Sequence, residues 1–158
     1  MNRKTVSILT FLSLLILLCF TWLFWQSQTK ISQAESEAVK LVEYDYPVKS
    51  VKRFYWVTID QTYFSLFFED KEGQERYAII ARDGGKAQYY TPSEIISEED
   101  AISIAKGDVN PHKILQARLG IMDDKPVWEV TFKNANGTLT YYYLNATNGE
   151  WIEKIENI

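Results

Sequence analysis

The sequence predicts an α+β protein with an N-terminal transmembrane helix followed by two tandem helix-plus-antiparallel-sheet units. An apolar run without charge at residues 6–25 predicts the transmembrane helix. Two sets of short segments rich in aromatic and β-branched residues, divided by turn residues, predict the sheets. The similarity of the two sets predicts the tandem arrangement. We expect a cytoplasmic tail, the membrane anchor, a first unit and a second unit at residues 1–5, 6–25, 26–92 and 93–158.

The apolar run at residues 6–25 is long enough to span a bilayer. An α-helix rises about 1.5 Å per residue, and the hydrocarbon core is about 30 Å thick. Arg3 and Lys4 precede the run, so the positive-inside rule predicts a cytoplasmic N-terminus and an extracytoplasmic C-terminal part. A cleaved signal peptide is the alternative, but its apolar region is usually shorter and ends in a small-x-small site. No clear site of that kind follows Trp25, which favours an uncleaved anchor.

Composition argues against several classes of function. The formal net charge is -4, which does not favour nucleic acid as a partner. Cys19, the single cysteine, lies in the apolar run and cannot form an intramolecular disulfide. His112 is the single histidine and has no cysteine outside the membrane to join it, so no metal or cofactor is expected. The paired carboxylates fall in turns or at a helix start, and the sequence therefore predicts a protein that is not an enzyme.

The first unit is predicted to contain one helix and four strands. Apolar residues recur with helical spacing over residues 31–42, either as a separate amphipathic helix or as a continuation of the anchor helix. Pro47 ends this helical pattern. Strands are expected at residues 50–59, 62–69, 74–82 and 86–90, with polar and glycine-containing turns between them.

The second unit is predicted to have the same order of elements. Ser97 and Asp100 have the spacing of a capping box at a helix start, and Gly107 and the pair Asn110-Pro111 indicate the helix end. Strands are expected at residues 113–121, 126–134, 138–145 and 150–156. Asn136-Gly137, between two of these segments, is a strong hairpin signal.

The two units align at a nearly constant spacing along the chain, which predicts tandem copies packed together. The matched pairs are Ala38 with Ala101, Tyr63 with Trp128, Gly73 with Gly137, and Gly85 with Gly149.

The strand patterns suggest where a partner protein could bind. Over residues 127–133 the alternation predicts one core face, with Trp128, and one solvated face, with Glu129. Residues 62–69 instead carry large apolar side chains on both faces. The second face is expected to pack on the other unit, to contact the membrane, or to bind a partner. The candidate partner-binding residues are Phe54, Trp56, Phe64, Leu66 and Phe68.

The second unit resembles the PepSY family. The resemblance rests on the capped helix ISEEDAISIAKGDV and on the strands in VWEVTFKNANGTLTYYYLNATNGEWIEKIE. With the anchor and the first unit, the whole chain is similar to the TseB-like regulators of cell-wall elongation in Gram-positive bacteria. The first unit departs from the second in having Tyr63 and Ser65 in place of Trp128 and Val130. The family resemblance implies a PepSY/cystatin-like fold and an ectodomain that binds a penicillin-binding transpeptidase without catalysis of its own.

The sequence therefore favours a non-catalytic, single-pass membrane protein whose extracytoplasmic part regulates an envelope protein. Two alternatives stay open. One is a PepSY-type protease inhibitor or chaperone-like module, and the other is an envelope sensor that binds a ligand.

Overall fold

The computed structural model describes residues 2–84 and 86–156 and begins with one long helix. Helix α1 (Arg3–Val42) is continuous over 40 residues, so the predicted helical segment at 31–42 is an extension of the apolar helix. The chain divides into two compact units, the first ending at Glu37 and the second beginning at Ala38. The last turn of α1 therefore belongs to the second unit.

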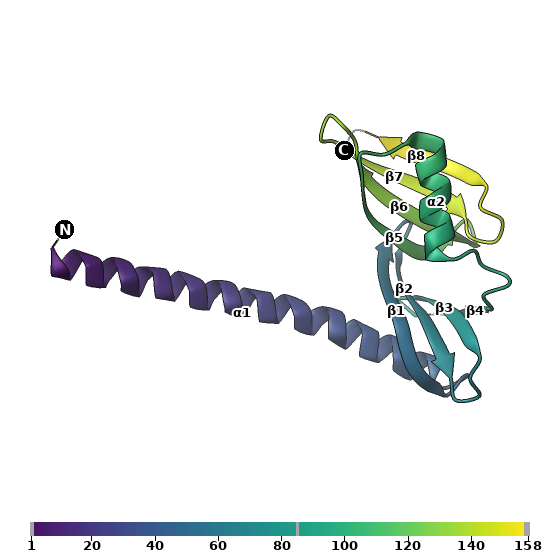
Figure 1. Cartoon of the computed structure of the whole chain (residues 1–158). Helices are drawn as coiled ribbons and strands as arrows, with labels where there is room; N and C mark the ends of the chain where they lie inside the picture. The colour runs from purple at the N-terminus through teal and green to yellow at the C-terminus, as the bar shows by residue number, and fades with distance from the viewer. Residues whose placement is uncertain (1, 85, 157–158) are drawn as a thin grey trace. The chain divides into compact units, whose positions relative to one another are not determined.

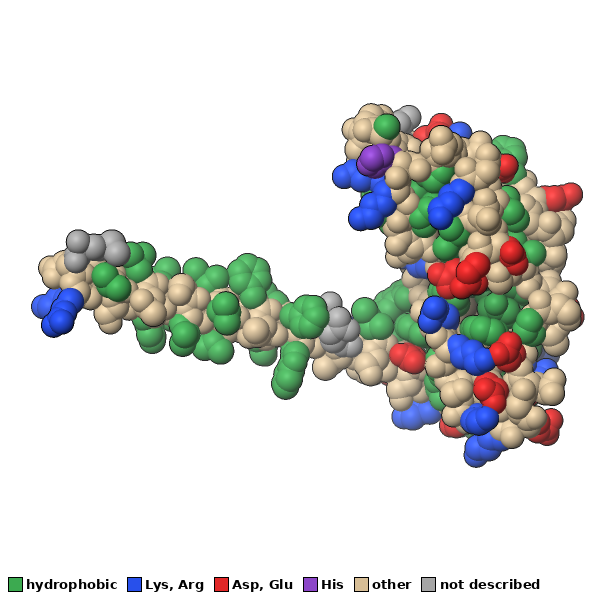
Figure 2. Space-filling model, viewed as in Figure 1, with side chains coloured by type: hydrophobic (Ala, Val, Ile, Leu, Met, Phe, Trp, Pro, Cys, Tyr) green, Lys and Arg blue, Asp and Glu red, His purple; other side chains and the backbone are tan. Residues whose placement is uncertain are grey.

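The first of these compact units is α1 as far as Glu37, and it includes the apolar run at residues 6–25. An 18-residue window of this helix has a mean hydropathy of 2.4, and the helix is long and apolar enough to cross a membrane. Its large side chains are exposed, among them Phe11 and Phe20 at 66% and 68%. Figure 2 shows hydrophobic side chains along this helix and basic side chains at its N-terminal end.

The α+β fold class predicted from the sequence is confirmed in the second unit (Figure 1), where two four-stranded antiparallel sheets each follow chain order. The first sheet contains β1 (Val48–Thr58), β2 (Thr62–Asp70), β3 (Glu75–Ala81) and β4 (Gln88–Tyr90). The second contains β5 (Lys113–Met122), β6 (Lys125–Lys133), β7 (Leu139–Asn145) and β8 (Trp151–Glu156).

Helix α2 (Glu98–Val109) lies over one face of the second sheet (Figure 1). Its start has the predicted capping box, in which the Ser97 side chain accepts a hydrogen bond from the Asp100 backbone N–H. Its end agrees with the predicted signal at Asn110-Pro111, because the helix ends at Val109 and is capped by Asn110, which has φ 44°, whereas Gly107 lies within the helix. Glycine inside a helix costs only about 1 kcal/mol, so packing can carry the helix past it.

Two of the turns between strands of the second sheet have residues with positive φ. Asp123 and Asp124 both have positive φ, 49° and 60°, as a two-residue hairpin turn requires. Gly149 has φ 75°, and a Cβ there would lie 2.7 Å from Ile104 Cδ1, so both the conformation and the space favour glycine. Gly85, which aligned with Gly149 in the sequence, lies outside the described residues.

The two sheets share one hydrophobic core with α2. Trp128 is fully buried at its centre, and its indole Nε1 donates a hydrogen bond to the Ile96 carbonyl oxygen at 2.9 Å. The ring of Tyr55, from the first sheet, meets the Trp128 ring edge-on at a centroid distance of 5.4 Å. Ala101 and Ala105 of α2 are buried in the same core. The aromatic residues that aligned between the units thus lie in a single core.

Strand β5 approaches the first sheet closely. The Ser65 hydroxyl on β2 donates a hydrogen bond to the Leu119 carbonyl on β5 at 2.8 Å. Gly120 allows this approach, because a Cβ at that position would lie 2.8 Å from Val57 Cγ1.

Two sequence expectations about strand faces were wrong. The second face of β2, with Phe64, does not pack on the second sheet, because the face carrying Tyr63 supplies the shared core. The second face of β6 is not solvated, since Glu129 is only 1% exposed.

Candidate interaction surfaces

The five predicted partner-binding residues lie together on one face of the first sheet, but they differ in exposure. The register pairs Phe54 with Leu66 and Trp56 with Phe64 across β1 and β2. Leu66 and Phe68 are fully buried, and Phe64 is 7% exposed. Phe54 and Trp56 are half-buried. Of the predicted set, these two therefore offer the most surface to another protein.

The Phe64 ring supports both half-buried aromatic residues. Its centroid lies 5.1 Å from the Trp56 ring, which it meets edge-on, and 5.8 Å from the Phe54 ring. The guanidinium carbon of Arg82 lies 6.0 Å from the centroid of the Trp56 ring. We call Phe54, Trp56 and Arg82 the aromatic edge. Large aromatic side chains and arginine are the residue types enriched in protein interfaces.

The last turn of α1 explains why the rest of this face is buried. Ala38 and Val42 are both fully buried. Leu41 of this turn and Ile80 of β3 line the same hollow of about 320 Å³. The first sheet is thus covered on one face by this helical turn and on the other by the shared core.

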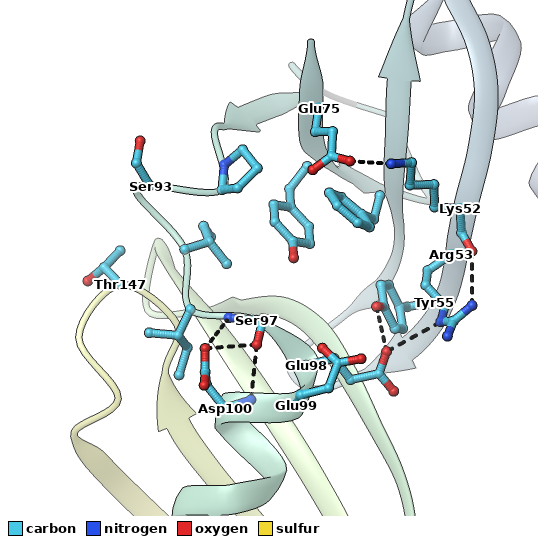
Figure 3. A pocket seen from close by; sticks show the side chains of 15 residues that line it. Lys52, Arg53, Tyr55, Glu75, Ser93, Ser97, Glu98, Glu99, Asp100 and Thr147 are labelled. Atoms are coloured by element: carbon cyan, nitrogen blue, oxygen red, sulfur yellow. Dashed lines mark hydrogen bonds and ion pairs between the residues drawn. The ribbon is translucent and has the colours of Figure 1, made fainter. Parts of the chain in front are cut away.

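A second concave surface, the intersheet cleft, lies between the first sheet and the start of α2 (Figure 3). Its volume is about 630 Å³. The first sheet contributes Lys52, Arg53, Tyr55, Phe67, Glu75 and Tyr77, and the α2 start contributes Ser97, Glu98, Glu99 and Asp100.

The two basic side chains of the intersheet cleft already have acidic partners. Lys52 forms an ion pair with Glu75 across the first sheet. Arg53 Nε lies 3.7 Å from Glu98 Oε2. The same Glu98 oxygen accepts a hydrogen bond from the Tyr55 hydroxyl at 2.9 Å (Figure 3). Burial, and then the charge of Glu98, raise the pKa of Tyr55 well above its usual range.

Aromatic rings line the part of the intersheet cleft that belongs to the first sheet. Phe67 and Tyr77 stack at a centroid distance of 4.5 Å, and the Tyr77 ring also meets Trp128 edge-on at 6.5 Å. Burial, followed by the charge of Glu99, raises the pKa of Tyr77 to about 12. The Tyr77 hydroxyl is therefore neutral at physiological pH.

The second sheet contains a buried carboxylate, that of Glu129, which was not predicted from the sequence. Glu129 Oε1 accepts a hydrogen bond from Arg118 Nε at 3.1 Å, and its Oε2 accepts one from the Tyr143 hydroxyl at 2.9 Å. Arg118 also donates to the Trp56 carbonyl at 3.3 Å. The hairpin centred on Asp123 and Asp124 sets Arg118 opposite Glu129, so this turn was the signal that could have identified the pair.

Within residues 2–84 and 86–156, no group of three or more His, Cys, Asp or Glu side chains is arranged to hold a metal ion. His112 is exposed. Lys52, Arg53 and Tyr55 of the intersheet cleft, and Glu129 of the second sheet, instead form ion pairs and hydrogen bonds within the protein.

Comparison with known proteins confirms the resemblance seen in the sequence. Residues 37–81 match the cell wall elongation regulator TseB-like domain. Residues 95–154 match PepSY, the peptidase propeptide and YPEB domain. The two matches follow one another along the chain, the first over the end of α1 and the first sheet, and the second over α2 and the second sheet.

A solved structure, that of the YpmB protein from Bacillus subtilis, has a similar fold. It is 23% identical in sequence, with a TM-score of 0.66, and the match covers 76% of this chain and 95% of that chain. A comparison with curated proteins gives no match.

Proposed function

We propose that this chain is a non-catalytic, membrane-anchored regulator of cell-wall elongation that acts by docking on an envelope protein, a penicillin-binding transpeptidase. The observation that carries this proposal is the TseB-like match at residues 37–81, which begins within the last turns of a helix long and apolar enough to cross a membrane. The description of the matched family suggests the process, which is cell-wall elongation. The apolar helix suggests the location, which is the membrane.

The proposed topology puts the N-terminus in the cytoplasm and the sheets outside. Arg3 and Lys4 at the start of α1 support this orientation through the positive-inside rule. We propose a cytoplasmic tail, an anchor and two tandem units at residues 1–5, 6–25, 26–92 and 93–158. Both units present the same order of a helix followed by a four-stranded antiparallel sheet, which supports a tandem origin.

Anchoring would help a weak interface to function. A protein confined to the layer beside a bilayer meets other membrane-tethered proteins at a raised effective concentration, and no new contact is needed for this gain. A small docking surface such as the aromatic edge is then sufficient. Phe64, Leu66 and Phe68 would act beneath it as the support that holds Phe54 and Trp56 in place.

A charge-insertion experiment tests this docking surface. Phe54→Glu adds a charge to a half-buried position of the aromatic edge. Leu115→Glu, at a residue 46% exposed on β5, is the matched control. We expect the wild type and the Leu115→Glu variant to co-purify with a transpeptidase after crosslinking in intact cells, and the Phe54→Glu variant to lose it. A Phe54→Glu protein with an unchanged melting temperature and undiminished capture would contradict the proposal.

A second function, inhibition of an envelope peptidase or a chaperone-like role, is favoured by one observation. The PepSY domain at residues 95–154 is described as a peptidase propeptide domain. This function predicts that the purified full-length protein slows an envelope protease in a dose-dependent way. If proteolysis proceeded at an unchanged rate in the presence of excess protein, the inhibitory function would be contradicted.

A further inference from the structure

We infer that the intersheet cleft binds a lysine or arginine side chain presented by a partner protein, with the Tyr77 hydroxyl and the Glu99 carboxylate as its recognition groups. The protein source of this side chain rests on the proposed function.

The Tyr77 hydroxyl is the first observation. Tyr77 is 4% exposed and lines the intersheet cleft. Tyr55, on the neighbouring strand, bonds to Glu98, whereas the Tyr77 hydroxyl has no hydrogen-bond partner among the described residues. The Tyr77 ring is buried, but its hydroxyl oxygen meets the solvent of the cleft, because no buried side-chain oxygen or nitrogen among the described residues lacks a hydrogen bond. A polar group that enters the cleft can therefore reach this hydroxyl and hydrogen-bond to it.

The charge of the intersheet cleft indicates that this group is a cation. Lys52 and Arg53 are balanced by Glu75 and Glu98. Glu99 is exposed and forms no ion pair within the described part of the chain. Asp100 adds a further carboxylate, and its Oδ2 accepts hydrogen bonds from the Ser97 hydroxyl at 2.8 Å and from the Ser97 backbone N–H at 3.4 Å. The helix start offsets these charges by only about half a positive charge.

The walls of the intersheet cleft suit the aliphatic stem of a basic side chain. Phe67 and Tyr77 both line the cleft, and their rings stack on each other with an interplanar angle of 18°. Lysine and arginine stems pack along apolar side chains while the charged end stays with polar groups. The ammonium nitrogen of Lys52 lies 5.6 Å from the centroid of the Phe67 ring, so a cation already lies over this ring in the free protein.

A binding experiment with the full-length protein in nanodiscs tests the chemistry. The probes are the N-acetyl methylamides of lysine, arginine and norleucine, the last having an uncharged aliphatic side chain. We expect saturable shifts of the α2 N-terminal amide resonances with the two basic probes and none with norleucine. Equal binding of norleucine, or no saturable shift with either basic probe, would overturn the inference.

Two conservative variants identify the recognition groups. Tyr77→Phe keeps the stacked ring, and Glu99→Gln removes a charge that has no ion-pair partner among the described residues. Each is expected to weaken binding of the basic probes about 10-fold, the effect of one hydrogen bond to a charged group. Tyr44→Phe and Glu43→Gln, both at exposed positions outside the intersheet cleft, are the matched controls and should bind as the wild type does. Unchanged affinity in both cleft variants would overturn the assignment.

A crosslinking experiment in cells tests the source of the side chain. A photoreactive residue replacing Ser93, an exposed position lining the intersheet cleft, should capture a partner peptide that contains lysine or arginine at the adduct. Adducts to peptides without a basic residue would overturn the inference. Failure of the probes to bind, with transpeptidase capture through the aromatic edge intact, would overturn this inference alone. Probe binding without any captured protein would instead overturn the proposed function and the protein source.

Discussion

The hydroxyl of Ser65 donates a hydrogen bond to the carbonyl oxygen of Leu119 at 2.8 Å, and this bond joins two residues 54 positions apart in the sequence. It connects β2 of the first sheet to β5 of the second, and both side chains are fully buried. The two sheets are therefore joined by a specific polar contact as well as by the shared core. A partner protein that binds the first sheet therefore binds a unit that also contains the second sheet.

Replacing Ser65 with alanine should destabilise the protein by about 1 kcal/mol, because a buried hydrogen bond between the sheets is lost. Chemical denaturation of the full-length protein measures the change. Ser50→Ala, at an exposed position on β1, is the matched control and should change stability by less than about 0.5 kcal/mol. Equal stabilities for the two variants would contradict the structural role of Ser65.

Gly120→Ala should destabilise the protein by about 1–3 kcal/mol, since the added Cβ would lie 2.8 Å from Val57 Cγ1 and 2.9 Å from Ile59 Cδ1. The double variant with Val57→Ala should lose less stability than the sum of the two single variants, because the second change makes room for the first. Denaturation midpoints of the four proteins provide the measurement. Strict additivity would mean that these two residues are not in contact.

Glu129→Ala should cost roughly 3 kcal/mol of stability, because it leaves the Arg118 guanidinium without its buried partner. The Tyr143 hydroxyl loses its acceptor in the same variant. Glu153→Ala removes an exposed glutamate from β8 and is expected to change stability by no more than about 0.5 kcal/mol. If Glu129→Ala also changed the stability by no more than about 0.5 kcal/mol, the face of β6 that carries Glu129 would be solvated, as the sequence predicted.

Stability should fall as the pH rises above about 10. Burial raises the pKa of Tyr55, Tyr142 and Tyr143 above the usual tyrosine range. The folded protein then retains protons that the unfolded chain releases, so the stabilisation present below the ordinary pKa is lost above it. Denaturant titrations at about pH 8 and about pH 11 test this, with lower stability expected at the higher value. Equal stability at both would contradict the burial of these hydroxyls.

Local sequence signals were sufficient to predict the helices and strands. They were not sufficient to predict which side chains pack against each strand face. The Ser97 capping box and the turn residues indicated α2 and the strands, because these structures depend on residues close in the chain. Strand faces depend on contacts that are distant in sequence. The alternation of residues predicted a solvated Glu129. In the structure, the strand register pairs Glu129 with Arg118 on β5 and with Tyr143 on β7.

The predicted partner-binding patch illustrates the same limit. Alternation in residues 62–69 correctly indicated two apolar faces, but it could not identify the cover of each. Burial of Phe64 and Phe68 leaves only part of the predicted patch at the surface, with residues 38–42 helping to cover this face. The intersheet cleft was not predicted at all, because Tyr77 of β3 and Glu99 of α2 are distant in the sequence and line the same cleft only once the first sheet packs beside α2.

In-cell photo-crosslinking from position 56 tests the central proposal most directly. A photoreactive residue replacing Trp56 would place the crosslinker on the aromatic edge of the full-length, membrane-bound protein. The predicted result is an adduct with a penicillin-binding transpeptidase, recovered from intact cells and identified by mass spectrometry. Adducts confined to cytoplasmic proteins, or the absence of any protein adduct while the variant stays folded in the membrane, would contradict it.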